Sequence, residues 1–180
     1  MIKKLILSGI IMLFTFTGCE SHGRVHDKNY LRAVSVTGDT QKTVTFTFFS
    51  KDGKYITTSG KDITEALETA ELRTGKEIFT GYTEMIVLDS NNSIETLEFM
   101  LHKWKVSPSC IIAHSDDQNG EDIFSSSIER LSGSVRTAVE QKKIPECDII
   151  TVMSELLGKN HSAPVAEITS EGVKKIHIIN

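Results

Sequence analysis

Residues 62–88, DITEALETAELRTGKEIFTGYTEMIVL, decide the fold. Asp62 can accept a hydrogen bond from the amide of Glu65 while the Glu65 side chain reaches back, the capping-box arrangement that begins a helix. Apolar residues then recur at helical spacing, and Gly75 suits the position just after the last turn. Residues 85–88 are apolar at every position, which indicates a strand at the centre of a sheet. A capped helix followed by such a strand predicts a layered α/β protein.

Further short elements flank this stretch on both sides. Upstream, Val44, Phe46 and Phe48 alternate with threonines, which predicts a strand that pairs with residues 30–36 and has one buried face. Downstream we expect helices over about 93–105, 128–142 and 148–157, strands at 110–113, 165–168 and 173–178, and a polar loop over 115–122. The predicted fold class is therefore α/β (α+β), a single domain with a mixed sheet and packed helices.

Composition narrows the class of protein. The chain has 180 residues, 20 Lys+Arg and 24 Asp+Glu, and a net charge of −4. Without a basic surplus we expect no nucleic-acid partner. Three cysteines are too few for a disulfide scaffold. Cys110 and Cys147 could pair outside the cytoplasm, or Cys110 could pack as a small hydrophobe in its strand, and the sequence leaves this open.

The N-terminus has the features of a secretory signal. Lys3 and Lys4 precede an apolar run over residues 5–16, which is too short to cross a bilayer as a helix. Gly18-Cys19 follows, and it resembles the lipobox of bacterial lipoproteins, in which the cysteine is acylated and becomes the first mature residue. The alternatives are an ordinary signal peptide with a chance cysteine, or a buried N-terminal strand.

The lipoprotein interpretation fixes the domain boundaries that we expect. Residues 1–18 are the signal peptide, 19–29 a polar tether and 30–180 the folded domain. Without residues 1–18 the chain carries a net charge of −6, so an anionic bilayer does not attract it. Acyl chains on Cys19 must hold the protein at the membrane, lipid-anchored on the extracytoplasmic face.

No catalytic motif is present in the sequence. It contains neither a P-loop nor a G-x-G-x-x-G turn, and Ser132 lacks the second glycine of a nucleophile elbow. The loop over 115–122 lacks acidic residues at the first and last calcium-ligand positions. A rival interpretation, an envelope hydrolase, would require His102, His114 and the Asp116/Asp117 loop to converge.

The histidines do not form a recognisable metal motif. His22 and His26 have i, i+4 spacing, but they lie in the tether with no matching ligand. The other four are dispersed along the chain: His102, His114, His161 and His177. We therefore expect no enzyme activity, and no catalytic, metal or cofactor site.

Several segments together carry a family resemblance. They are DITEAL at 62–67, RTGKEIFTGYTEMIVL at 73–88, EQKKIPE at 140–146 and APVAEI at 163–168. In order and spacing they resemble the N-terminal domain of the spore germination receptor C-subunit lipoproteins, the Ger(x)C family. Tyr82 stands where family members prefer histidine, and typical members continue through further C-terminal domains beyond the position of Asn180.

The resemblance implies a function. It implies a lipoprotein acylated at Cys19, for example by palmitate, on the outer face of the spore inner membrane. There it would be a non-catalytic subunit of a germinant receptor that responds to nutrients, with integral membrane subunits as partners. A possible interaction loop comprises Arg73, Gly75, Gly81 and Tyr82, although the two glycines also suit purely structural roles. The alternative is an unrelated extracytoplasmic lipoprotein that binds a small ligand or an envelope component.

Overall fold

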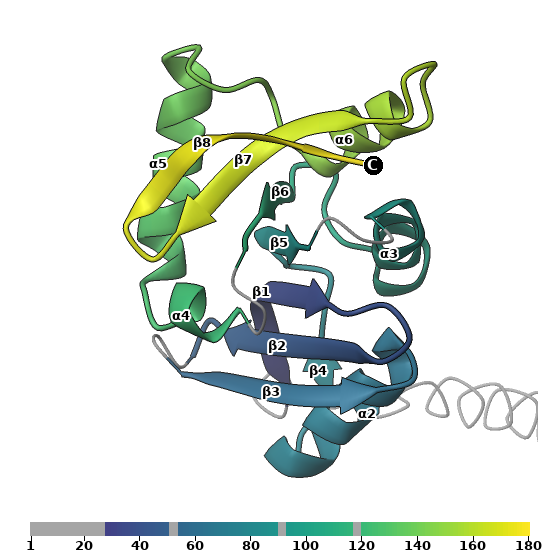
Figure 1. The fold of residues 1–180 in the computed structure, drawn as a ribbon. Coiled ribbons are helices and arrows are strands. Elements are labelled where there is room, and N and C mark those ends of the chain that lie inside the picture. Colours follow the sequence, from purple (N-terminus) through teal and green to yellow (C-terminus); the bar gives the residue numbers. More distant parts are fainter. Residues whose placement is uncertain (1–27, 51–53, 90–92, 117–119) are drawn as a thin grey trace, which may run out of the picture.

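The computed structural model describes residues 28–50, 54–89, 93–116 and 120–180 (Figure 1). The predicted signal peptide, Cys19, the two tether histidines and Asp117 lie outside the described residues. Among the helices that are described, none has the length and apolar character needed to cross a bilayer.

The strands form one mixed sheet. They are β1 (Asn29–Thr37), β2 (Lys42–Phe48), β3 (Tyr55–Gly60), β4 (Ile78–Phe79), β5 (Met85–Leu88), β6 (Ile111–His114), β7 (Ala163–Thr169) and β8 (Gly172–Ile179). The sheet runs in the order β3-β2-β1-β5-β6-β7-β8, and β4 pairs with β1. The central strands β1, β5, β6 and β7 are parallel, whereas β2, β3 and β8 run antiparallel to their neighbours. The predicted fold class is confirmed, with β5 buried at the centre of the sheet.

Helices cover both faces of the sheet. They are α2 (Ile63–Thr74), α3 (Ser93–Phe99), the π-helix η2 (Met100–Trp104), α4 (Glu121–Phe124), α5 (Ile128–Glu140) and α6 (Ile149–Leu156). In Figure 1, α4 and α5 lie on the left of the sheet, and α3 and α6 lie on the right. Between them they bury the apolar side chains of the parallel strands.

The predicted caps of α2 are present. The Asp62 carboxylate accepts a hydrogen bond from the Glu65 amide at 2.9 Å, and the Glu65 side chain accepts one from the Lys61 amide at 2.7 Å. At the other end, Gly75 has φ of +65°, and its N–H donates to the Glu71 carbonyl. These local interactions explain why the sequence predicted both ends of this helix.

The expectation of a single buried face for β2 is wrong. Thr45 and Thr47 are buried, and so are the hydrophobic residues with which they alternate. The Thr45 hydroxyl bonds to that of Thr57 at 3.0 Å, and Thr57 donates to the carboxylate of Glu121 on α4 at 2.8 Å. The Thr45 hydroxyl therefore has a partner in the covered face, whereas the buried Thr47 hydroxyl has none among the described residues.

Two further expectations need correction. The helix expected over 93–105 is α3 followed by the π-helix η2, and a left-handed Lys105 with φ of 56° ends it. Met100, the first residue of η2, is buried in the core. The loop expected over 115–122 ends earlier, because α4 begins at Glu121. That helix is too short to show a periodic pattern.

Candidate functional site

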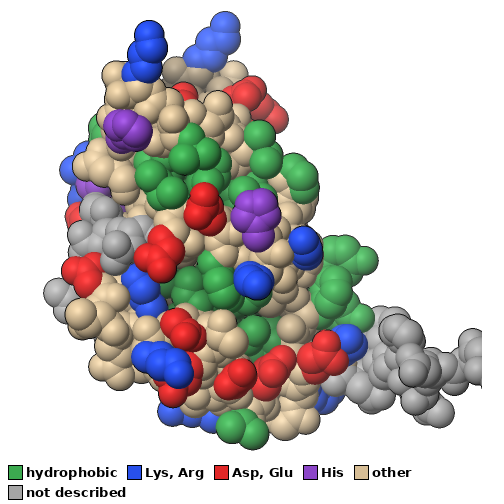
Figure 2. Space-filling model, turned by 90° about the vertical axis from the view of Figure 1, so that its right-hand side faces the viewer, with side chains coloured by type: hydrophobic (Ala, Val, Ile, Leu, Met, Phe, Trp, Pro, Cys, Tyr) green, Lys and Arg blue, Asp and Glu red, His purple; other side chains and the backbone are tan. Residues whose placement is uncertain are grey.

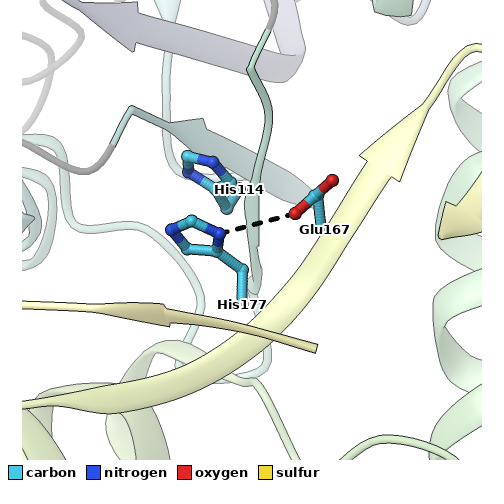
Figure 3. A group of neighbouring side chains, drawn as sticks. All are labelled: His114, Glu167 and His177. Carbon is cyan, nitrogen blue, oxygen red and sulfur yellow. Dashed lines mark ion pairs between the residues drawn. The ribbon is translucent and has the colours of Figure 1, made fainter. Parts of the chain in front are cut away.

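Two histidines and a glutamate lie together where parallel strands end (Figure 3). His114 is the last residue of β6 and pairs directly with Glu167 on β7. His177 lies on β8 opposite Val165, two residues from Glu167, so its side chain points to the same face. The carboxyl ends of parallel strands are where open α/β sheets commonly bind ligands. We call these three residues the His-Glu cluster.

The His-Glu cluster is largely buried. The exposed fractions are 3% for His114, 2% for Glu167 and 25% for the His177 side chain. The two imidazole rings stack with their centroids 3.5 Å apart and their planes 14° apart. His177 Nδ1 lies 3.4 Å from Glu167 Oε2, the contact that the dashed line in Figure 3 marks. His114 Nε2 lies 3.1 Å from an oxygen of Asp116, a residue of the loop that follows β6.

Two consecutive lysines neutralise the buried carboxylate. Lys174 Nζ lies 2.7 Å from Glu167 Oε1, and Lys175 Nζ lies 3.2 Å from Oε2. The strand register shifts at this point, so β8 carries one extra residue, and the resulting bulge lets both lysines reach one partner. Burial disfavours the charged form of Glu167. The two ammonium groups favour that form more strongly, so they hold the pKa of Glu167 below its usual value.

The histidine on the edge strand remains neutral at neutral pH. Burial and the neighbouring His114 ring disfavour a positive charge on His177, and they outweigh the attraction of Glu167. The pKa of His177 therefore lies below its usual value. A neutral imidazole keeps one nitrogen lone pair, which is the form that binds metals.

The chemistry available to the His-Glu cluster is metal binding. Each residue offers one ligand atom, and these atoms lie within 4.8 Å of one another. Two imidazoles and a carboxylate are a ligand set that suits Zn²⁺ and similar ions. Sequence analysis interpreted the histidines as dispersed, because His114 and His177 come together only through the pairing of β6, β7 and β8. The one local signal was Glu167, a charge within the otherwise apolar run at 163–168.

The convergence required by the hydrolase interpretation is not seen among the described residues. His114 does contact Asp116. His102, however, is exposed on η2, and within the described part of the chain no hydrogen bond or ion pair joins it to His114.

The predicted interaction loop divides into two parts. Arg73 and Gly75 lie at the end of α2, where the Arg73 guanidinium donates to the Thr57 carbonyl at 2.7 Å. Gly81 and Tyr82 lie between β4 and β5, and a Cβ on Gly81 would lie 3.0 Å from the ring of Phe79. The absence of a side chain at Gly81 therefore makes room for an aromatic residue.

Three aromatic rings come together beside this second part. Tyr30 and Phe79 face each other across the parallel pairing of β1 with β4, with ring centroids 5.6 Å apart. Tyr82 lies 5.2 Å from the Phe79 ring and 6.0 Å from the Tyr30 ring. Tyr82 is 63% exposed and Phe79 36%. We call these three residues the aromatic cluster.

Acidic, basic and hydrophobic side chains are all present on the face that Figure 2 shows. Figure 2, which views the side where α3 and α6 lie in Figure 1, shows acidic side chains across the lower half of that face. Hydrophobic side chains are visible between them, together with single Lys or Arg side chains.

The two cysteines of the folded domain are free and buried. Burial raises the pKa of the Cys147 thiol to about 11 and raises that of Cys110 further. Both therefore remain protonated at neutral pH, as expected of cysteines that pack as small hydrophobic residues.

Comparison with known proteins identifies the family. A family model described as the spore germination protein N-terminal domain matches residues 26–170. Searches of curated proteins and of solved structures found no match. The matched range includes β1 to β7 and all the described helices. The chain therefore belongs to the spore germination protein family and carries its N-terminal domain.

Proposed function

We propose that this germination protein is a lipid-anchored, non-catalytic subunit of a germinant receptor, and that its aromatic cluster binds an integral membrane subunit. The observation that carries the proposal is the exposure of Phe79 and Tyr82 beside Tyr30, which lies on the first strand of the domain. Tyr30 is only eleven residues after Cys19 in the sequence. The receptor assignment itself rests on the family and on the lipobox-like sequence.

The short connection limits how far this surface can lie from the bilayer. A fully extended chain spans at most about 3.5 Å per residue, so Tyr30 lies within roughly 40 Å of an anchored Cys19. The extracytoplasmic parts of an integral membrane subunit would lie in the same zone. The aromatic cluster is therefore within reach of such a partner.

The chemistry of the aromatic cluster suits protein binding. Tyrosine offers a large apolar ring together with a hydroxyl that can form a hydrogen bond, and it is enriched among the residues that dominate interface energies. Tyr82 already packs against Phe79 and Tyr30, so its ring loses little conformational freedom when a partner covers it.

The anchor is tested by replacing Cys19 with alanine. The wild-type protein should sediment with the membrane fraction and incorporate labelled palmitate, whereas Cys19→Ala should do neither. Cys147→Ala is the matched control, because that cysteine is buried and its loss should leave the label in place. A Cys19→Ala protein that still carries palmitate would refute the anchor.

The contact is tested by affinity purification from spore membranes. Wild-type protein should recover an integral membrane germination subunit, and Tyr82→Ser should weaken this recovery by on the order of thirtyfold, as for a hot-spot residue. Leu72→Ser is the control, because Leu72 is also an exposed hydrophobic residue, 85% exposed, but lies on α2. Equal recovery with both variants would contradict the proposed surface.

The alternative, capture of a small ligand, has weaker support. A hollow of about 260 Å³ between α5 and β6 is lined by Ile111, Val135, Val139 and Cys147, among others. This volume is below the usual range for pockets that bind small molecules, whereas a hollow of about 420 Å³ between α5 and β8 lies within that range. A ligand that raised the melting temperature of the Tyr82→Ser protein would favour this alternative.

A further inference from the structure

We propose that the His-Glu cluster is a binding site for a divalent transition-metal ion of the Zn²⁺ type, with His114, Glu167 and His177 as its protein ligands. This inference is independent of the proposed receptor function. It rests on hydrogen bonding, burial and strand register in the described part of the chain.

The hydrogen bond of His114 leaves Nδ1 free. A carboxylate only accepts hydrogen bonds, so in the metal-binding form of the ring, which carries one proton, the 3.1 Å contact with Asp116 places that proton on His114 Nε2. The lone pair then lies on Nδ1, which is buried and has no hydrogen-bond partner among the described residues. A carboxylate that orients a histidine in this way is the usual second layer of a zinc site. An unpartnered buried nitrogen is also the kind of group that a metal satisfies.

Strand pairing fixes two of the ligands, and the third can move. His114 and Glu167 are direct neighbours across the parallel pair β6 and β7. Because the rings of His114 and His177 are stacked and nearly parallel, their lone pairs lie in two parallel planes, and one ring must turn before both nitrogens face the same ion. His177 lies on the edge strand β8 with a side chain 25% exposed, so its ring has room to turn. The ligand atoms now lie within 4.8 Å of one another. Zn–N and Zn–O bonds near 2 Å require them to lie about 3.3 Å apart, so they must also move closer together.

The lysines compete with a metal ion for the same carboxylate. Lys174 and Lys175 contact the two oxygens of Glu167, but their side chains are 52% and 58% exposed. They can turn into solvent when an ion takes their place. Because of this competition, we expect that removal of a lysine strengthens metal binding. The two imidazoles favour Zn²⁺ over Ca²⁺ and Mg²⁺, which prefer oxygen ligands.

The test is a Zn²⁺ titration of the full chain in detergent by isothermal calorimetry, with Co²⁺ absorption as a second measurement. The background carries His22→Ala and His26→Ala, which removes the tether histidines as a source of binding. We expect one ion per chain, and a loss of affinity on the order of a hundredfold in His114→Ala and in Glu167→Gln. Lys175→Met should bind on the order of tenfold more tightly, because a like charge beside the ion is gone.

His161→Ala is the matched control, because this histidine is exposed and lies outside the His-Glu cluster. It should bind Zn²⁺ like the background protein. His177→Ala replaces a partly exposed residue and keeps the test decisive if the buried substitutions do not fold. The proposal is overturned if the background protein binds no ion, if His161→Ala loses as much affinity as His177→Ala, or if Lys175→Met binds more weakly.

Discussion

Substitution of Gly120 by alanine should destabilise the protein through two separable effects. Gly120 precedes α4 with φ of +67°, a left-handed conformation that costs an L-residue about 1–2 kcal/mol. In addition, a Cβ at this position would lie 2.4 Å from the Cβ of Ser35 and 2.5 Å from its Oγ. Ser35 is buried in β1, so the clash cannot be relieved by a turn into solvent. Gly120 is therefore packed directly against β1.

The expected loss of stability is the sum of the conformational cost and the cost of the clash. Overpacking of a buried position costs about 1–3 kcal/mol, so Gly120→Ala should lower the free energy of unfolding by about 2–5 kcal/mol in all. Gly75 separates the conformational cost from the clash. Its φ is +65°, and among the described residues beyond its own turn no atom lies within 4 Å of the place that a Cβ would take. We therefore expect Gly75→Ala to cost only about 1–2 kcal/mol.

Urea unfolding followed by the fluorescence of Trp104, the single tryptophan, measures both effects. Trp104 is buried against Phe46 and Phe99, so its emission reports on the core. In a Ser35→Gly background the clash is gone, and the cost of Gly120→Ala should fall by about 1–3 kcal/mol, to the level of Gly75→Ala. A Gly120→Ala variant as stable as Gly75→Ala, or one that Ser35→Gly does not relieve, would refute this packing.

Three further results are expected. The pKa of Glu167 is lowered in the fold, so its charged form stabilises the fold above the pKa of an unfolded glutamate, and this contribution disappears as the pH falls through the folded pKa. Glu167→Gln should therefore flatten the loss of stability that urea unfolding measures between about pH 5 and 3. A pH dependence of stability unchanged by Glu167→Gln would contradict the assignment. Asp148 caps α6 by accepting from the amides of Ile150 and Thr151, so Asp148→Ala should cost about 1 kcal/mol in the same assay, and no loss would mean that the cap contributes nothing. Cys147 is buried with a pKa of about 11, so a thiol reagent should label it far more slowly in the native protein than in urea, and equal rates would show that the thiol is accessible.

Sequence patterns predicted the elements whose causes are local. The ends of α2 depend on Asp62 and Gly75, which act within a few residues of themselves. The central position of β5 follows from four successive apolar residues. The threonine face of β2 is buried for a different reason, because Glu121, far along the chain, hydrogen-bonds to Thr57 on β3, which is the partner of Thr45. No pattern within residues 44–48 could have shown this.

The two sites depend on strand pairing to different degrees. Tyr82 was accessible to sequence analysis through the family resemblance, but Tyr30 and Phe79 join it only because β1 and β4 are parallel neighbours. The His-Glu cluster depends entirely on the register of β6, β7 and β8. A shift of one residue in β7 would turn Glu167 to the opposite face of the sheet. Dispersed histidines therefore could not be recognised as neighbours from spacing alone.

The central claim, that this germination protein works by contact at its aromatic cluster, is tested most directly by photocrosslinking in intact spores. Benzoylphenylalanine in place of Tyr82 should yield, on irradiation, one adduct with an integral membrane germination subunit. The same amino acid in place of the exposed Leu72 should yield none. Equal adducts at both positions, or an adduct only at position 72, would contradict the account.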